Sequence, residues 1–324
     1  MTTNILSKRG IEFLGVIQTD FPVTERPFAE VANRLGWTEK EVIDSLYTLM
    51  HSGIVRAFGP VFEPRKLGYK STLIAAKVES ERVAEIAAAM LDIREITHNY
   101  LRDHELNLWF TLTARSKEII DDIVLWFKKF TGVKKVLDLP ILKVYKISAV
   151  FDVNLKSHAN RSFNDFVRPM NESEKNIVRT IQNDFPIAER PFQIIAEASD
   201  SMESEIIETV NRWLDEGTIR RFGARLNHRR IGYTANTLAV WEGLHIDIWG
   251  KKFAELPEVT HCYRRKPHTD WPKELYTMIH AKTDNDMGNL LARMRSWARG
   301  AHMESLKTIS ELKKTSMKYF LEEE

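Results

Sequence analysis

The stretch IQTDFPVTERPF at residues 17–28 recurs as IQNDFPIAERPF at residues 181–192. The match extends without a gap over 17–69 and 181–233, where 20 of 53 aligned residues are identical. It resumes downstream, where the matching segments are HNYLR at 98–102 with HCYRR at 261–265, and NLWFTLTA at 107–114 with ELYTMIHA at 274–281. Such self-similarity predicts that the 324-residue chain is a tandem duplication. Copy two carries four extra residues, around 266–271.

The first part of each copy predicts three helices followed by two short strands. In copy one, apolar residues recur at helical spacing over three segments, 9–20, 26–35 and 39–51. Thr38 is a good helix N-cap, and Glu41 completes a capping box. The segment IVRAFGPVF at 54–62 predicts a β-hairpin, with Gly59 at its turn and Gly223 at the matching turn of copy two. Three helices and a hairpin form a winged helix-turn-helix.

The second part of each copy alternates strands and helices. In copy one, strands are predicted at 71–78, 95–103, 106–114 and 133–147, and helices at 80–92 and 116–130. The order βαββαβ is that of the ferredoxin-like fold, and copy two repeats it over 234–320. The predicted fold class is therefore α+β, a tandem repeat of a winged helix-turn-helix and a ferredoxin-like domain. The predicted boundaries are 1–68 and 69–151 for copy one, 152–170 for a polar linker, and 171–232 and 233–324 for copy two.

The composition limits the classes of function. Lys and Arg total 47 against 45 Asp and Glu, and this formal charge of +2 lacks the basic excess of a non-specific nucleic-acid coat protein. The single cysteine, Cys262, excludes an internal disulfide and a multi-cysteine zinc site, and we assign it no role. Because the sequence shows no signal peptide and no apolar run of about 18 residues, we expect a cytoplasmic protein without a membrane span.

The third predicted helix of each copy, which would enter the DNA groove in a regulator, is acidic. Near phosphates a recognition helix needs cationic and neutral polar residues. In copy one, Lys40 is outnumbered by the acids Glu39, Glu41 and Asp44. In copy two, Arg212 is outnumbered by the acids Glu203, Glu205, Glu208, Asp215 and Glu216. We therefore do not expect a nucleic acid as a partner.

One motif of the second part occurs in both copies and carries chemistry. Because alternate residues of a strand share a face, two sets of side chains project together, namely His98, Tyr100 and Arg102, and His261, Tyr263 and Arg265. Each set offers an imidazole and a phenol for proton transfer and a guanidinium for a carboxylate. In the alternative interpretation, the histidines are hydrogen-bonded structural residues inherited from a common ancestor.

The wing of copy two, TIRRFGARLNHRR at 218–230, is rich in basic residues and contains no acid. Its candidate anion-binding residues are Arg220, Arg221, Arg225 and His228, and two further candidates, Arg264 and Lys266, adjoin the second motif. The alternative interpretations of this wing are a solvated face and a nucleic-acid wing.

A winged helix-turn-helix followed by a ferredoxin-like domain resembles the leucine-responsive/AsnC family of transcription regulators. The strings DFP…ERPF, RFG, LGY and HNYLRDHELNLWFTL of copy one are instead similar to the first subunit of siroheme decarboxylases. Those of copy two, RRFGA, HRRIGY and ELKKTSMKYF, are similar to the second subunit. The resemblance implies a carboxy-lyase in fused two-subunit form. Such an enzyme removes CO2 from two acetate side chains of siroheme to give 12,18-didecarboxysiroheme, for haem d1 or alternative haem biosynthesis.

In such a decarboxylase the candidate residues would transfer protons, ligate iron or bind carboxylates. His98 and His261 are expected to donate a proton or to ligate the iron of the substrate, with Tyr100 and Tyr263 as alternative donors. The basic residues would bind the other carboxylates: Arg102, Arg220, Arg221, Arg225, His228, Arg264, Arg265 and Lys266. No cofactor is expected, since siroheme carries its own iron and electron sink. Siroheme is the expected partner, and the two copies are expected to pair sheet to sheet as an intramolecular pseudo-heterodimer.

Two other functions fit the same predicted fold. One is a haem- or tetrapyrrole-sensing regulator of the leucine-responsive/AsnC type, which would bind DNA without turnover. The other is a scaffolding pseudo-dimer in which the histidines and arginines are structural. A gel-shift on DNA distinguishes the regulator from an enzyme, and titration with siroheme distinguishes the scaffold.

Overall fold

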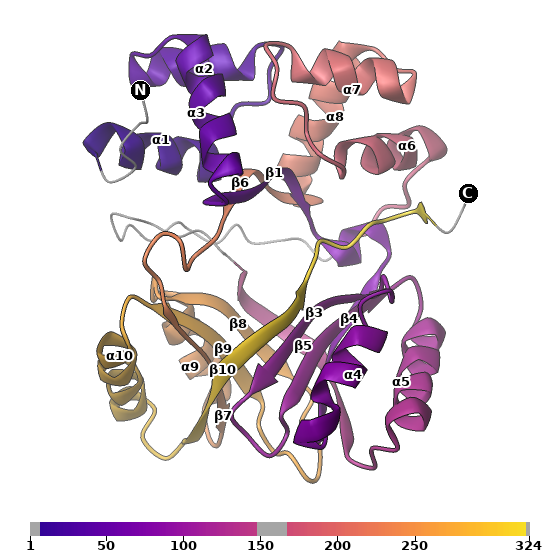
Figure 1. Ribbon diagram of the computed structural model, residues 1–324, viewed down its shortest axis with the longest axis vertical. Coiled ribbons are helices and arrows are strands. Elements are labelled where there is room, and N and C mark those ends of the chain that lie inside the picture. The colour runs from indigo at the N-terminus through magenta and orange to yellow at the C-terminus, as the bar shows by residue number, and fades with distance from the viewer. Residues whose placement is uncertain (1–6, 148–166, 322–324) are drawn as a thin grey trace. The chain divides into compact units, whose positions relative to one another are not determined.

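The computed structural model describes residues 7–147 and 167–321, which divide into two compact units (Figure 1). Both copies contribute to each unit. The first, here called the winged unit, contains Met1–Leu67, Val150–Gly232 and Lys318–Glu324, and the second, the barrel unit, contains Gly68–Ala149 and Tyr233–Met317. Most of the predicted linker, residues 152–166, lies outside the described residues.

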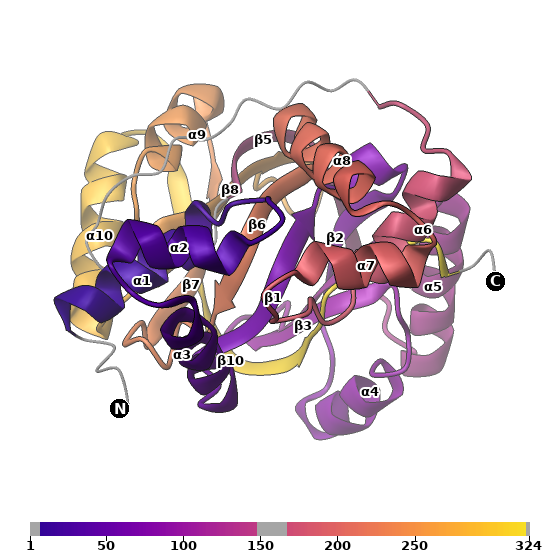
Figure 2. The ribbon, with the colours of Figure 1, turned by 90° about the horizontal axis from the view of Figure 1, so that it is seen from above.

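Within the described residues, the winged unit has three α-helices from each copy. They are α1 (Lys8–Thr19), α2 (Pro27–Leu35), α3 (Glu39–His51), α6 (Glu172–Ile181), α7 (Pro191–Ser199) and α8 (Glu203–Glu216). The first three confirm the helices predicted for copy one. α3 begins at the predicted capping box, where the Thr38 side chain accepts a hydrogen bond from the backbone N–H of Glu41 and the Glu41 carboxylate accepts one from the N–H of Thr38. The two sets of helices flank a shared two-stranded ribbon (Figure 2).

The repeated motif forms the aromatic core of the winged unit. Its phenylalanines pack on one another, and they are Phe21, Phe28 and Phe58 from copy one and Phe185, Phe192 and Phe222 from copy two. The rings of Phe21 and Phe222 stack across the copies, with centroids 5.8 Å apart. Each of the six side chains is at most 6 % exposed. Because both copies bury apolar area in one core, the core stabilises their pairing.

The predicted wing hairpins are wrong. β1 (Val55–Phe62) is a single strand that pairs antiparallel with β6 (Ile219–Leu226) of copy two. Gly59 and Gly223, which were predicted at turns, lie opposite each other in the middle of this ribbon, with φ of 135° and 145°. A Cβ on Gly223 would lie 2.2 Å from the carbonyl oxygen of Ile17. The glycines therefore permit a close approach, and the strand partner comes from the duplicate instead of from the same segment.

The barrel unit confirms the predicted order βαββαβ in both copies. Copy one supplies β2 (Lys70–Ala76), α4 (Val83–Ala89), β3 (Ile96–Arg102), β4 (Leu108–Ala114), α5 (Lys117–Thr131) and β5 (Val136–Ile147). Copy two supplies β7 (Ala235–Glu242), α9 (Ile246–Ala254), β8 (Val259–Arg265), β9 (Leu275–Ala281), α10 (Asp284–Trp297) and β10 (His302–Lys314). Two short 3-10 helices, Pro64–Leu67 and Ser80–Arg82, complete the elements.

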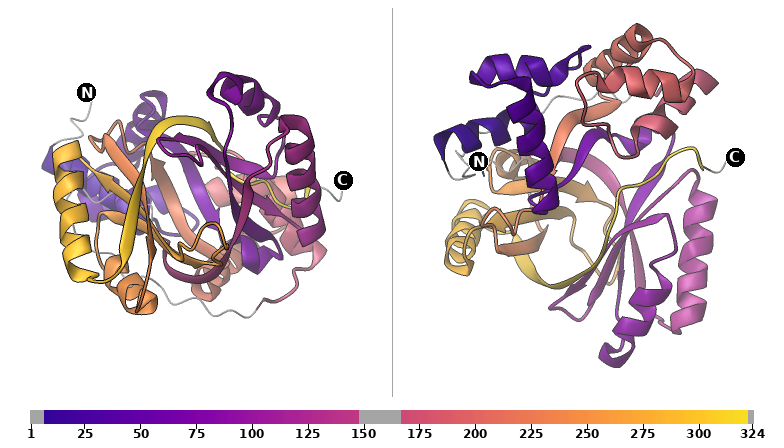
Figure 3. Two further views of the ribbon diagram at one scale, coloured as in Figure 1. Left: turned by 90° about the horizontal axis from the view of Figure 1, so that it is seen from below. Right: turned by 45° about the horizontal axis from the view of Figure 1, so that its top comes forward.

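The eight strands close into a barrel in the order β10-β3-β4-β2-β5-β8-β9-β7 (Figure 3). The last strand of each copy changes partner along its length. β5 pairs first with β2 and then with β8, and β10 pairs first with β7 and then with β3. The copies therefore pair within one chain, as expected, but strand edge to strand edge instead of sheet to sheet. Because the barrel is closed, the strands that would form the edges of each open sheet find hydrogen-bonding partners for their backbone N–H and C=O groups.

Apolar cores lie on both sides of the barrel wall, one inside the barrel and others between the strands and the helices. The barrel interior holds an apolar cluster from both copies, made of Ala75, Leu106, Trp109, Leu137, Leu139, Leu238, Val240, Trp271, Tyr276 and Leu306. The helices of each copy cover the outer face of that copy's strands with a separate apolar cluster. These clusters identify which strand residues face inward. In the part of the chain that the structure describes, no helix is long and apolar enough to cross a membrane.

Candidate functional site

The two predicted motifs lie on the inner face of the barrel wall. Tyr100 on β3 stands opposite Trp109 on β4, and Tyr263 on β8 stands opposite Tyr276 on β9. Trp109 and Tyr276 both belong to the interior cluster. Since opposite residues of paired strands share a face, the tyrosines and their i ± 2 neighbours also point inward. The structure thus places an imidazole, a phenol and a guanidinium from each copy on the inside of one barrel.

Within each motif the three side chains contact one another in the order of the sequence. In copy one, the rings of His98 and Tyr100 have centroids 6.2 Å apart, and the guanidinium carbon of Arg102 lies 5.3 Å from the centroid of the Tyr100 ring. In copy two the corresponding distances are 6.0 Å and 5.1 Å. The near-identity of the two sets shows that the duplication preserved the arrangement as well as the residue types.

The histidines are held by the preceding residue of the same strand. Nδ1 of His98 lies 3.0 Å from the hydroxyl of Thr97, and Nδ1 of His261 lies 3.0 Å from the hydroxyl of Thr260. Both imidazoles are half-buried, and both threonines are buried. A hydrogen bond at Nδ1 fixes the ring orientation, which suits a histidine that transfers a proton or binds a metal through its other nitrogen.

The two arginines lie deeper than the histidines. Arg102 is 4 % exposed and Arg265 is 7 % exposed. Burial lowers the pKa of Arg102 to about 10, and Tyr100 opposes this shift. Burial also lowers the pKa of Arg265, and Tyr263 is the first of the groups that oppose it. A guanidinium in a medium of low dielectric acts strongly on its surroundings through its charge.

Each arginine donates a hydrogen bond to the other copy, at the point where the last strand of that copy changes partner. Nη1 of Arg102 lies 3.0 Å from the carbonyl oxygen of Leu306 and 3.0 Å from the hydroxyl of Thr308, both on β10. Nη1 of Arg265 lies 2.7 Å from the carbonyl oxygen of Leu139 on β5. The two guanidiniums therefore sit at the seams between the copies.

Copy two differs from copy one in the aromatic residue beside its motif. Copy two has Tyr276 at the position that matches Trp109 of copy one. The hydroxyl of Tyr276 accepts a 2.7 Å hydrogen bond from Nε1 of Trp271. Trp271 belongs to the extra segment of copy two, and its ring also packs against Trp109 and against His104. The extra residues thus cover the interior cluster at the end of the barrel that carries the β3–β4 and β8–β9 connections.

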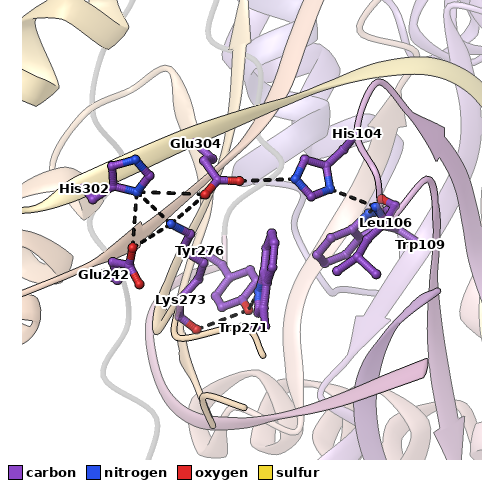
Figure 4. A network of polar contacts seen from close by, with 9 residues as sticks. All are labelled: His104, Leu106, Trp109, Glu242, Trp271, Lys273, Tyr276, His302 and Glu304. Carbon is purple, nitrogen blue, oxygen red and sulfur yellow. Dashed lines mark hydrogen bonds and ion pairs between the residues drawn. The ribbon is translucent and has the colours of Figure 1, made fainter. Parts of the chain in front are cut away.

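A polar network crosses the same end of the barrel (Figure 4). The ammonium of Lys273, whose side chain is 3 % exposed, lies 2.9 Å from Glu242 and 2.7 Å from Glu304. Nε2 of His104 lies 3.2 Å from the second oxygen of Glu304, and its Nδ1 accepts a hydrogen bond from the N–H of Leu106. The two repeated motifs do not predict this network, and its one signal in the sequence is the insertion in copy two.

Two predicted substrate-binding residues next to the second motif lie away from its inner face. Arg264 pairs in register with Leu275, which belongs to the core beneath the helices. Its guanidinium lies 2.6 Å from Glu274 and 2.9 Å from Asp247, so its charge is balanced. Lys266 is exposed. The structure therefore brings together Arg265 and Tyr263 but separates Arg264 from them.

The basic candidates of the copy-two wing belong to the winged unit. The wing sequence contains no acid, but copy one supplies Glu63, whose carboxylate is 2.6 Å from Arg220 and also binds Arg65. Burial raises the pKa of Glu63, but these two guanidiniums outweigh it and hold the pKa below its usual value. Arg220 is thus part of an ion pair between the copies.

The next two wing arginines are Arg221 and Arg225, and the neighbouring charges that lower their pKa are those of other arginines. Arg221 donates hydrogen bonds to the carbonyl oxygens of Gln18 and Ala224. Burial and then the like charges of Arg225 and Arg56 lower the pKa of Arg221 to about 10. His228 is buried nearby in sequence. An anion bound close to these guanidiniums would relieve their mutual repulsion.

Part of the acidity of the third helices is structural. Glu39 at the start of α3 pairs with Arg26, and Glu203 at the start of α8 pairs with Arg190. Arg26 also lies 2.8 Å from Glu189 of copy two. The arginines of the repeated ERPF motif thus hold the helix starts, which explains why the motif keeps its charge pattern. Among the described residues, no cluster of three or more His, Cys, Asp or Glu could hold a metal ion.

Comparison with known families divides the chain in the same way in both copies. A family described as an AsnC-like ligand binding domain matches residues 66–146 and 230–313. A family described as a siroheme decarboxylase NirDL-like HTH domain matches residues 12–56 and 174–220.

The chain is also similar to individual proteins over most of its length. A siroheme decarboxylase of Hydrogenobacter thermophilus is 34 % identical over 323 residues, which cover 96 % of this chain and 95 % of that protein. The alpha subunit of a siroheme decarboxylase of Desulfovibrio desulfuricans is 41 % identical over 140 residues, covering 43 % of this chain and 80 % of the subunit. A crystal structure of the siroheme decarboxylase NirDL with an iron-uroporphyrin III analogue superposes with a TM-score of 0.74 at 30 % identity, covering 98 % of this chain and 96 % of that one.

Proposed function

This chain belongs to the siroheme decarboxylase family, and we propose that it removes CO2 from two acetate side chains of siroheme to give 12,18-didecarboxysiroheme. The enzyme is a carboxy-lyase, and its product serves haem d1 or alternative haem biosynthesis. The observation that carries the proposal is the 34 % identity to a siroheme decarboxylase over 96 % of the chain. The two inward-facing motifs, one in each copy, supply the chemistry that the reaction needs.

Each decarboxylation has a simple balance. The bond between the carboxyl carbon and the methylene carbon breaks, CO2 leaves, and the electron pair stays on the methylene, in conjugation with the macrocycle. One proton then bonds to the methylene and gives a methyl group. The protein must therefore hold the substrate by its other carboxylates, place the reacting carboxylate in less polar surroundings and deliver one proton for each CO2. This balance requires no organic cofactor, because siroheme provides the electron sink.

The histidines and tyrosines of the two motifs are the candidates for the chemical step. His98 and His261 donate the proton or bind the iron of the substrate, and Tyr100 and Tyr263 are the alternative donors. The orientation of each imidazole by its threonine supports either role for the histidines.

The basic candidates for substrate binding differ in how their charge is balanced. Arg220 and Arg264 already pair with carboxylates, so a substrate would have to compete for them. Burial and the like charges of Arg225 and Arg56 lower the pKa of Arg221, so within the winged unit Arg221 is the better candidate for binding an anion. The roles of His228 and Lys266 in substrate binding stay predictions.

Anaerobic incubation with siroheme, followed by mass spectrometry, tests the function. We expect a species that has lost one CO2 and then a species that has lost two. Unchanged siroheme, under conditions in which a known siroheme decarboxylase converts it, would contradict the function and leave a tetrapyrrole-binding protein. A gel-shift on DNA then checks for a regulator.

Alanine variants test the assignment of the histidines. We expect His98→Ala and His261→Ala each to slow at least one CO2 loss by about 100-fold, and the exposed control His51→Ala to leave the rate unchanged. A histidine that binds the iron will also change the absorption spectrum of bound siroheme, whereas a donor will not. If both alanine variants turn over at the wild-type rate, the assignment is wrong even where the function holds.

A further inference from the structure

We infer that Arg102 and Arg265 are positioning residues, and that each one fixes the tyrosine and histidine of its own copy by bonding to the last strand of the other copy. The inference rests on the proposed decarboxylation and assigns these arginines a different role from the carboxylate binding expected from the sequence. It follows from three observations on the barrel unit.

The first observation is the direction of the arginine hydrogen bonds. Nη1 of Arg102 is occupied by the carbonyl of Leu306 and the hydroxyl of Thr308. Nη1 of Arg265 is occupied by the carbonyl of Leu139. A substrate carboxylate that bound through Nη1 would have to displace these acceptors and leave a buried carbonyl without its donor, which costs free energy. The hydrogen bonds therefore anchor the guanidinium to the barrel wall.

The second observation is the place of the anchor in the fold. β10 pairs with β7 as far as Lys307 and with β3 from Thr308 onward, and β5 pairs with β2 as far as Pro140 and with β8 from Ile141 onward. Arg102 bonds to Leu306 and Thr308, one on each side of the change in β10. Arg265 bonds to Leu139, two residues before β5 begins to pair with β8 at Ile141. At these points the ladder of backbone hydrogen bonds changes partner, so a side-chain donor that satisfies a carbonyl there also holds the two copies in register.

The third observation is the chain of contacts from the anchor to the catalytic candidates. The guanidinium of Arg102 lies over the Tyr100 ring, and the Tyr100 ring stacks on His98. Arg265, Tyr263 and His261 repeat the chain in copy two. A cation over the face of an aromatic ring attracts the ring and restricts its motion. The histidine of one copy is thus oriented through a residue bonded to the other copy.

The steady-state kinetics of the full-length enzyme separate a positioning residue from a substrate ligand. We expect Arg102→Met and Arg265→Met each to lower kcat by about tenfold or more, with KM within about twofold of wild type. Arg102→Lys and Arg265→Lys should recover part of kcat, because an ammonium can still donate to the strand carbonyl. The exposed Arg94→Met serves as the control that leaves both constants unchanged.

A milder variant keeps the inference testable if the methionine variants fail to fold. Thr308→Val removes only the side-chain acceptor of Arg102, and the equivalent position in copy one, Ile141, offers no such acceptor to Arg265. We expect Thr308→Val to lower kcat by about threefold with KM unchanged. A rise in KM of tenfold or more at unchanged kcat in the arginine variants would make the arginines substrate ligands. Wild-type kinetics in all of the folded variants would make them purely structural. Either result overturns the inference.

A measurement that needs no turnover separates failure of this inference from failure of the proposed function. With 13C-labelled tyrosine, the ring signals of the eight tyrosines can be followed by NMR, and Tyr100→Phe and Tyr263→Phe identify the two of interest. We expect Thr308→Val to shift the Tyr100 signals and to leave those of Tyr263 in place. Unshifted Tyr100 signals in Thr308→Val and Arg102→Lys would overturn the inference, whether or not the wild type decarboxylates siroheme.

Discussion

Glu174 is a buried carboxylate of the winged unit whose charge is balanced by two arginines. Its carboxylate binds Arg168 before α6 and Arg212 on α8, and it also accepts the N–H of Asn171 in a capping box. Burial alone would raise the pKa of Glu174, but Arg168, Asn171 and Arg212 together lower it to about 2. One side chain thus ties the start of α6 to α8.

The lowered pKa predicts how stability depends on pH. Because the folded-state pKa of about 2 lies below the unfolded value of 4.5, the stabilisation is fully present above 4.5 and is lost as pH falls toward 2. We expect Glu174→Gln to lower the free energy of unfolding by about 1–2 kcal/mol at pH 7, after allowance for solvent screening. The difference from wild type should shrink toward pH 3. Urea unfolding at several pH values measures it, and the exposed Glu172→Gln is the control. A difference that does not change with pH would contradict the prediction.

At the scale of elements, the β1–β6 ribbon depends on two glycines in the same conformation but in different surroundings. Both have φ in the region that L side chains rarely adopt. A Cβ on Gly59 would meet only the Cβ of Phe185 at 3.3 Å, whereas a Cβ on Gly223 would meet the backbone oxygen of Ile17 at 2.2 Å. A backbone group in a helix cannot move aside as a side chain can.

This asymmetry predicts unequal effects of alanine. We expect Gly59→Ala to cost about 1–2 kcal/mol, from backbone strain, and Gly223→Ala to cost clearly more. Gly15 in α1 has no heavy atom within 4 Å of an added Cβ, so Gly15→Ala should be neutral or slightly stabilising. Thermal unfolding of the three variants tests the order. Equal losses for Gly59→Ala and Gly223→Ala would show that the clash with Ile17 is relieved at no cost.

The last strand of each copy also has a buried lysine, whose ammonium group donates hydrogen bonds to backbone carbonyls at the C-terminal end of a helix of the other copy. Lys313 on β10 donates to the carbonyl oxygens of Met90, Leu91 and Ile93 after α4. The lysine of β5, Lys146, donates to the carbonyl of Leu256 after α9. Burial lowers the pKa of both ammonium groups. The helix C-terminus compensates each buried charge.

The number of carbonyls that lose their donor predicts the size of the effect. We expect Lys313→Met to lower the free energy of unfolding by about 2–4 kcal/mol and Lys146→Met by about 1–2 kcal/mol. Lys314, which lies next to Lys313 and pairs with Glu311, offers the control Lys314→Met. Chemical unfolding measured on all three variants checks the ranking. A Lys146→Met variant that loses more than Lys313→Met would contradict the carbonyl count.

At the scale of the whole molecule, the copies exchange strands in both units. β1 pairs only with β6 among the described strands, and β5 and β10 each lie between strands of different copies. A single copy would therefore expose one unpaired wing strand and both ends of an open four-stranded sheet. One relative, which is 41 % identical over 43 % of this chain, is the alpha subunit of a siroheme decarboxylase. In that relative, the part that matches this chain belongs to a separate subunit.

The exchange predicts the behaviour of a divided chain. We expect residues 1–157 expressed alone to aggregate, and the same fragment co-expressed with residues 158–324 to form a stable 1:1 complex that converts siroheme. Size-exclusion chromatography with light scattering and the mass-spectrometric assay test both outcomes. A soluble, monomeric, folded copy one would contradict the need for exchanged strands.

The duplication, the helices of the first part and the order βαββαβ of the second could all be predicted from the amino-acid sequence. These follow from identities at a fixed offset, from apolar periodicity and from caps such as Thr38 with Glu41, and each of these acts over a few residues. Strand alternation also determined that His98, Tyr100 and Arg102 share a face. The resemblance to siroheme decarboxylases lies in local strings of the same kind.

The partner of each strand could not be predicted from the sequence and follows from how the two copies fold together. Backbone N–H and C=O groups are alike in every strand, so an edge carries no local mark of its partner, and the choice falls to the side chains buried once the copies meet. For this reason the wing became an inter-copy ribbon instead of a hairpin, and Glu63 of copy one became the partner of Arg220. For the same reason Arg102 and Arg265, whose binding of substrate stays a prediction, lie buried at the seams of the barrel.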